Sequence, residues 1–98
     1  MAENKVINAI KFFKKSLKET GLKVSRVILF GSQAKGKATK ESDVDIVIIS
    51  DAFKGKDIFE RAQLTKDAEI KTIKKFLIPL DILTMTPDEW KRNKAMLT

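Results

Sequence analysis

Two short apolar runs, residues 27–30 and 46–49, constrain the fold of this chain more than any other feature. Both are rich in β-branched or aromatic side chains, which is the composition of buried strands. The segment between them is polar: Gly31 and Ser32 follow the first run, three lysines come next, and Asp43 and Asp45 lead into the second run. A chain of 98 residues can form only one small core. We therefore expect both runs to be strands of one sheet.

Helical patterns surround these runs. Apolar residues recur at helical spacing near the N-terminus, at Val6, Ile10, Phe13 and Leu17. Gly21 is expected to close that helix, a longer helix is predicted over residues 57–75, and Thr86-Pro87-Asp88-Glu89 is a typical helix start. Strands are predicted over residues 24–30, 44–50 and 77–83, with a short helical turn over 32–37 and a turn over 50–55. This order predicts an α/β (α+β) fold, a single domain over residues 1–98 in which helices flank one small mixed β-sheet.

The composition excludes several kinds of chemistry. The chain has no cysteine and no histidine, so disulfides, thiolate metal sites, histidine catalysis and zinc sites are ruled out. A catalytic metal would have to be bound by oxygen atoms, which favours Mg²⁺ or Mn²⁺. No window approaches the roughly 18 apolar residues of a membrane span, and the N-terminus lacks the apolar core of a signal peptide. We therefore expect a cytoplasmic protein that does not enter a membrane.

The formal charge of +7 suits an anionic partner: a nucleotide, a nucleic acid or an acidic protein surface. A solvated coat of lysines on helix surfaces is the simpler explanation of the same charge. Direct nucleic-acid binding has little further support, because the chain has no tyrosine and its phenylalanines fall at core spacing.

Asp43, Asp45 and Asp81 are the candidate metal ligands. Side chains alternate across a strand, so Asp43 and Asp45 are expected on one face, with Val44, Ile46 and Ile48 on the other. Two carboxylates on one face repel each other unless a cation lies between them. Asp81 interrupts the third apolar run, where an acid is costly without a partner. If the third strand lies beside the second, the three acids could hold two Mg²⁺ ions about 3.5–4 Å apart for a displacement at phosphorus.

Gly31 and Ser32 are candidate phosphate-binding residues. Glycine lets the backbone approach a ligand closely, and a serine at the start of a helical turn presents its hydroxyl and N–H groups to an anion. Lys35 follows one turn later and could add a charge to the same phosphates. Each feature also has a simpler explanation: the Asp-x-Asp pair could arise by chance, Gly-Ser could be a plain turn, and Asp81 could be an edge acid facing water. Their combination in consecutive strands favours the metal site.

Gly31-Ser32, ten further residues and Asp43-Val44-Asp45 resemble the signature of the DNA polymerase β-like nucleotidyltransferase superfamily. The short chain is similar to its minimal branch, the minimal nucleotidyltransferases (MNT), and Asp81 falls where the third family carboxylate belongs. The resemblance implies that Asp43, Asp45 and Asp81 are catalytic and bind metal, with Asp81 helping to activate the acceptor hydroxyl. It also implies that Gly31 and Ser32 bind the phosphates of the nucleoside triphosphate. Many relatives have arginine at the position of Lys35. Lysine keeps the positive charge but cannot make the two parallel hydrogen bonds with which an arginine guanidinium binds a phosphate.

The resemblance also implies a biological role. Minimal nucleotidyltransferases commonly act as antitoxins of HEPN-domain ribonuclease toxins, which implies transfer of AMP from ATP to a tyrosine of such a toxin and a hetero-oligomer with it. Two alternatives stay open: a nucleotidyltransferase acting on a small molecule or an RNA end, and a non-catalytic antitoxin that neutralises its partner by binding. A chain this small has little surface for recognising a large acceptor. We therefore expect a partner to bring the acceptor in through an exposed apolar patch and the final helix.

Overall fold

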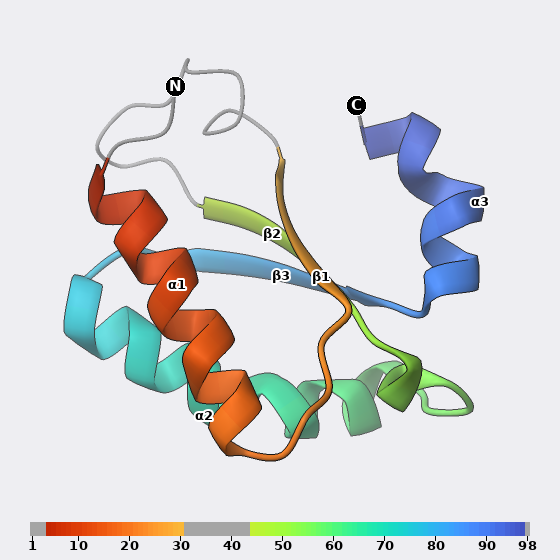
Figure 1. Cartoon of the computed structure of the whole chain (residues 1–98), viewed down its shortest axis with the longest axis horizontal. Coiled ribbons are helices and arrows are strands. Elements are labelled where there is room, and N and C mark those ends of the chain that lie inside the picture. Colours follow the sequence, from red (N-terminus) through yellow and green to blue (C-terminus); the bar gives the residue numbers. More distant parts are fainter. Residues whose placement is uncertain (1–3, 31–43, 98) are drawn as a thin grey trace.

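The computed structural model describes residues 4–30 and 44–97, and Figure 1 shows the arrangement of their helices and strands. Along the chain these are α1 (Asn4–Glu19), β1 (Arg26–Phe30), β2 (Val44–Ile49), the short 3₁₀ helix η1 (Asp51–Phe53), α2 (Ile58–Phe76), β3 (Leu80–Met85) and α3 (Pro87–Leu97). The helical turn predicted over residues 32–37 lies outside the described residues. Within the described ranges, no helix is both long enough and apolar enough to cross a membrane.

The three strands form one sheet in the order β1-β2-β3. β1 and β2 are antiparallel, whereas β2 and β3 are parallel and are joined through α2. A parallel pair needs such a crossover because its strands start at the same edge of the sheet. The predicted class, a small mixed sheet with flanking helices, is therefore confirmed, and β2 is its central strand.

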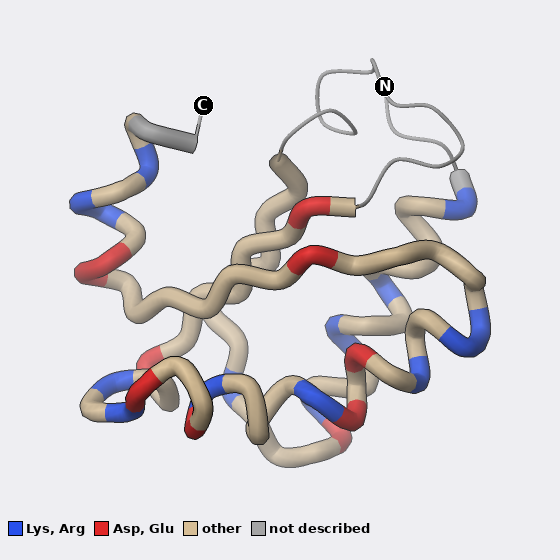
Figure 2. The backbone as a smooth tube through the Cα atoms, turned by 180° about the vertical axis from the view of Figure 1, so that it is seen from behind, with Lys and Arg blue, Asp and Glu red and all other residues tan. Residues whose placement is uncertain are grey.

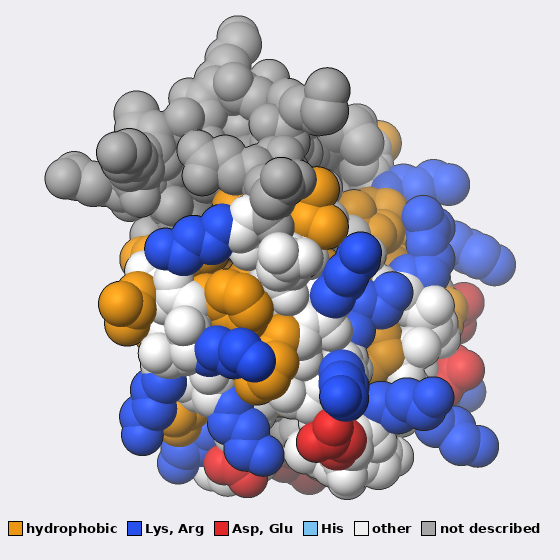
Figure 3. All heavy atoms as spheres, turned by 60° about the vertical axis from the view of Figure 1, so that its left-hand side comes forward, with side chains coloured by type: hydrophobic (Ala, Val, Ile, Leu, Met, Phe, Trp, Pro, Cys, Tyr) orange, Lys and Arg blue, Asp and Glu red, His pale blue; other side chains and the backbone are white. Residues whose placement is uncertain are grey.

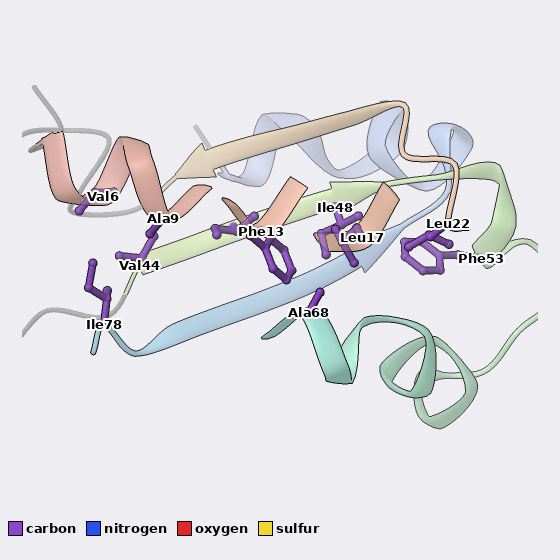
Figure 4. Packing of buried hydrophobic residues seen from close by; sticks show 11 residues of the cluster. Val6, Ala9, Phe13, Leu17, Leu22, Val44, Ile48, Phe53, Ala68 and Ile78 are labelled. Atoms are coloured by element: carbon purple, nitrogen blue, oxygen red, sulfur yellow. The ribbon is translucent and has the colours of Figure 1, made fainter. Parts of the chain in front are cut away.

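The hydrophobic core lies between the sheet and the pair α1 and α2, which cover the same face (Figure 4). The alternation of β2 places Val44, Ile46 and Ile48 on this face, as predicted, and all three are fully buried. α1 and α2 contribute Val6, Ala9, Phe13, Leu17 and Ala68, and Leu22, Phe53 and Ile78 complete the core. Asp45, Val47 and Ile49 consequently belong to the opposite face of β2.

Glycine ends the first helix, as predicted. Gly21 has a positive φ of 90°, its N–H binds the carbonyl of Lys18, and the next N–H, that of Leu22, binds the carbonyl of Leu17. This pair of bonds is a Schellman motif, which satisfies carbonyls that the helix end would otherwise leave unpaired. Leu22 and Leu17 also join the core, so the motif positions the chain for β1.

Several predicted boundaries differ from the structure. The first strand begins at Arg26 rather than Val24, and η1 occupies part of the expected turn, with Ser50 as its N-cap. The third strand begins at Leu80 rather than residue 77, because Leu77 caps α2 in the left-handed conformation with φ 55°. A residue that ends a helix in this way cannot also begin an extended strand. The apolar character of residues 77–79 did not distinguish these two roles.

Capping boxes begin α2 and α3. At α2, the carboxylate of Asp57 accepts from the N–H of Glu60 at 2.8 Å and the carboxylate of Glu60 accepts from the N–H of Asp57 at 3.1 Å. At α3, the Thr86 hydroxyl accepts from the N–H of Glu89 at 3.2 Å and the Glu89 carboxylate accepts from the N–H of Thr86 at 2.8 Å. The helix start predicted at Thr86-Pro87-Asp88-Glu89 is therefore confirmed.

Arg61 joins α2 to β3 and α3. Its guanidinium donates to both carboxylate oxygens of Glu89, at 2.7 and 3.3 Å. It also donates to the carbonyl of Lys56 at 2.9 Å and to that of Thr84 at 3.3 Å. The Arg61 side chain is only 14% exposed, so this bidentate pair is well shielded from water. We refer to these contacts as the Arg61 clamp.

The Arg61 clamp predicts a pH dependence of stability. The hydrogen bond from Arg61, aided by that from the N–H of Thr86, lowers the pKa of Glu89 in the folded state. A carboxyl group with a lower pKa when folded stabilises the fold at higher pH and loses that contribution as the pH falls through the folded value. The free energy of unfolding, measured by urea titration, should therefore fall more steeply for the wild type than for Glu89→Gln between about pH 5 and pH 3. Equal slopes would contradict this role.

Candidate active site

Asp45 and Asp81 lie directly beside each other on neighbouring parallel strands. The register of β2 and β3 pairs Asp45 with Asp81, and Figure 2 shows the two acidic positions side by side. Paired residues of adjacent strands project from the same face, with strands about 4.8 Å apart. Both carboxylates therefore leave the face of the sheet opposite the core. The condition that the third strand lies beside the second is met, and this adjacency brings the two acids together.

The two acids differ in exposure. Asp45 is half-buried on the central strand, whereas the side chain of Asp81 is exposed on β3, at the edge of the sheet. The expected burial cost at Asp81 is therefore absent, because the acid faces water even though its neighbours Leu80 and Ile82 pack against the core. Asp81 is consequently open to an incoming molecule.

Glu69 of α2 interacts electrostatically with Asp81, which the sequence did not indicate. Partial burial raises the pKa of Glu69, and repulsion from Asp81 raises it further. Glu69 and Asp81 belong to different elements, so only the packing of α2 against the sheet brings their charges into interaction.

The other predicted site residues, Gly31, Ser32, Lys35 and Asp43, lie outside the described residues. The register nevertheless shows where this segment starts and ends. Phe30, the residue before Gly31, pairs with Asp45, and Val44, the residue after Asp43, begins β2. The chain therefore leaves and re-enters the described sheet beside Asp45.

The donor set fits a hard divalent cation. Asp45 and Asp81 offer carboxylate oxygens on one face, and these are the ligands that Mg²⁺ and Mn²⁺ prefer. Among the described residues, no group of three acids, histidines or cysteines is arranged to bind a metal ion. Asp43 would be the third ligand of the predicted set. A metal bound there would neutralise the negative charge of Asp45 and Asp81 and of an approaching phosphate.

Several lysines lie at the C-terminal end of α1, away from Asp45 and Asp81. A hollow of about 650 Å³ at the end of α1 is lined by Lys14, Lys15, Lys18 and Lys23. β1 runs from this end of the sheet toward Phe30, so the hollow and Asp45 lie at opposite ends of that strand. Figure 3 shows basic side chains spread over this side of the molecule, with far fewer acidic ones. This charge is therefore not part of the Asp45 and Asp81 site.

Comparison with known proteins identifies the class. The sequence model of the nucleotidyltransferase domain matches residues 10–97. The match covers most of the chain, including Asp45 and Asp81, so this protein belongs to the nucleotidyltransferase domain family. Domains of this family generally use divalent metals, in agreement with the oxygen ligands described above.

Two proteins of Methanocaldococcus jannaschii are similar to part of this chain. One, named Putative protein adenylyltransferase MJ0604, is 48% identical over 44 residues, 44% of each chain. The other, named Putative protein adenylyltransferase MJ0141, is 52% identical over 46 residues, 45% of this chain and 46% of its own. The aligned stretches thus span less than half the length of these relatives.

Solved structures share the fold at low sequence identity. A putative nucleotidyltransferase from Sulfolobus solfataricus has a TM-score of 0.53 and 22% identity, covering 92% of this chain and 81% of that one. The BolA domain of SufE1 from Arabidopsis thaliana has a TM-score of 0.59 and 22% identity, covering 91% and 99%. At such identities the likeness concerns the fold alone. The family assignment therefore rests on the sequence match.

Proposed function

We propose that this protein transfers AMP from ATP to a tyrosine hydroxyl of a HEPN-domain toxin and thereby acts as its antitoxin. The observation that carries the proposal is the pairing of Asp45 with Asp81 within a nucleotidyltransferase domain. The names of the two Methanocaldococcus relatives support a protein as acceptor. The HEPN-domain partner comes from the resemblance to minimal nucleotidyltransferases, and the protein and its partner would form a hetero-oligomer.

The reaction is a displacement at the α-phosphorus of ATP. The oxygen of the acceptor hydroxyl forms a bond to this phosphorus, the bond to the bridging oxygen of the β-phosphate breaks, and pyrophosphate leaves. The proton of the hydroxyl is lost in the same process. Asp81 is exposed and is the register partner of Asp45 on the neighbouring strand, so an acceptor can reach the Asp81 carboxylate. Asp43, Asp45 and Asp81 would hold Mg²⁺ or Mn²⁺, while Gly31, Ser32 and Lys35 would bind the triphosphate.

A labelling experiment tests the acceptor. The protein is incubated with Mg²⁺ and a candidate HEPN-domain protein, using ATP labelled either at the α-phosphate or at the γ-phosphate. We expect the HEPN-domain protein to gain the α-label and not the γ-label, because AMP is transferred and pyrophosphate is released. Replacement of the acceptor tyrosine by phenylalanine should prevent labelling. Labelling of an RNA end or a small molecule instead would favour the alternative class of acceptor.

Neutralisation of the toxin distinguishes catalysis from binding. The ribonuclease activity of the HEPN-domain protein is measured after incubation with wild-type protein or with Asp45→Asn, each with ATP and Mg²⁺. We expect only the wild type to suppress it. Full suppression by Asp45→Asn would instead favour an antitoxin that acts by contact alone.

A further inference from the structure

The first turn of α2 exposes two large apolar side chains in succession. Ile58 is 72% exposed and Phe59 is 78% exposed. Neither belongs to the core cluster, so the fold does not use them. Burying a side chain of this size is worth about 1.5–3 kcal/mol, which these residues forgo in the isolated chain. Adjacent exposed residues of this kind mark interaction surfaces more often than isolated ones.

A hollow lies directly beside Ile58. It measures about 360 Å³ and is bounded by Ile58, by Ile82 and Leu83 of β3, and by the Arg61 clamp. Leu83 is itself 39% exposed. Ile58 and Leu83 thus border the hollow at the outer edge of β3, and the exposed side chain of Phe59 follows Ile58 on the same turn of α2. We call these three side chains the apolar patch. The hollow is large enough to accept an apolar side chain.

The apolar patch continues into the candidate active site. Leu83 lies two residues after Asp81 on β3, so the two side chains share one face of the sheet and are about 7 Å apart along the strand. An acceptor segment that fills the hollow and continues along β3 past Leu83 therefore reaches the Asp81 carboxylate. This position relative to the catalytic acids is what a binding site for the residues around an acceptor hydroxyl requires.

The charges around the hollow restrict its occupant. Arg61 and Glu89 of the lining neutralise each other, and the carboxylates of Asp57 and Glu60 on the same turn do not line the hollow. Lys56 also lines the hollow, and among the described residues it makes no salt bridge. The hollow therefore suits an apolar side chain with a carboxylate beside it.

We propose that the apolar patch docks the acceptor protein, which inserts an apolar side chain flanked by an acidic residue and so places its hydroxyl at Asp81. This inference rests on the proposed function and names the surface that selects the acceptor. Phe59 and Ile58 are specificity-determining residues and take no part in the chemistry. Binding of ATP and Mg²⁺ is independent of the patch.

Phe59→Glu tests this surface without threatening the fold. Residue 59 lies in the first turn of α2, where an added carboxylate interacts favourably with the helix dipole. We expect the variant to bind the HEPN-domain protein at least about tenfold more weakly, the effect of removing a buried interface anchor. AMP transfer to that protein should fall equally, whereas affinity for Mg-ATP should not change. Phe59→Leu should keep most of the binding because it keeps an apolar side chain.

Leu77→Asn is the matched control. Leu77 is 79% exposed at the other end of α2, and asparagine tolerates its left-handed conformation. This variant should bind the HEPN-domain protein and transfer AMP as the wild type does. Circular dichroism and thermal unfolding verify that all variants are folded.

The outcomes separate this inference from the proposed function. If the wild type binds and labels the HEPN-domain protein and Phe59→Glu does so equally well, the patch is not the docking surface. If the wild type binds without labelling, the loss of binding in Phe59→Glu still supports the patch while the proposed function fails. If the wild type neither binds nor labels, both are overturned. Light scattering of the protein alone completes the test, because a dimer that Phe59→Glu dissociates without loss of labelling would assign the patch to self-association.

Discussion

Asp45→Asn is expected to abolish nucleotidyl transfer while leaving the fold intact. Its carboxylate is paired with Asp81 on one face of the sheet, where the predicted metal would bind. Asparagine keeps the shape but loses the charge that attracts the cation, and such an interaction is worth several kcal/mol in the transition state. We expect the rate of pyrophosphate release in the presence of acceptor to fall by about a thousandfold or more.

The fold should tolerate this substitution. Asparagine has nearly the same size and shape as aspartate, so the free energy of unfolding of the metal-free variant should stay within about 1 kcal/mol of the wild-type value. Asp51→Asn is the control, because Asp51 is exposed and follows the other end of β2. It should keep full activity. Substantial transfer by Asp45→Asn would show that the paired acids are not the catalytic centre.

Arg61→Ala is expected to cause a large loss of stability. The substitution removes four hydrogen bonds to Glu89, Lys56 and Thr84 and leaves a carboxylate that is only 30% exposed without its partner. Breaking a fully buried pair in this way costs about 3–5 kcal/mol, and the partial exposure of Glu89 lowers the expected cost to about 2–3 kcal/mol. Urea denaturation of the wild type and of Arg61→Ala measures this difference in the free energy of unfolding.

Arg92→Ala is the matched control for the Arg61 clamp. Arg92 is an exposed arginine of α3, so its loss should change the free energy of unfolding by less than about 0.5 kcal/mol. Equal effects of the two substitutions would show that the clamp contributes little. Because Arg61 and Glu89 also border the hollow beside Ile58, Arg61→Ala should weaken acceptor binding as well.

Most of the fold could be predicted from local patterns. The spacing of Val6, Phe13 and Leu17 indicates the buried face of α1, and Thr86 with Glu89 marks the start of α3. These signals involve residues that are close in sequence, so they can be recognised without knowing the tertiary structure. The end of α2 at Leu77 was not predicted, because hydropathy does not show that an apolar residue adopts the left-handed conformation.

The candidate site was predictable in part. The strand period indicates on which face Asp45 lies, because alternation needs no knowledge of neighbouring strands. Asp81 could be proposed as its partner only on the condition that the third strand lies beside the second. Glu69 could not be proposed at all, since its interaction with Asp81 depends on how α2 packs.

The oxygen-only chemistry, the approximate positions of the helices and strands, and the resemblance of Gly31-Ser32 and Asp43-Val44-Asp45 to nucleotidyltransferases can be predicted from the amino-acid sequence. These properties depend on which residues are present and on their spacing. The folded chain was needed to show that Asp45 and Asp81 meet, that Asp81 faces water, and that Ile58 and Phe59 remain outside the core. Strand order and burial follow from the packing of the whole chain, which brings together residues that are distant in sequence.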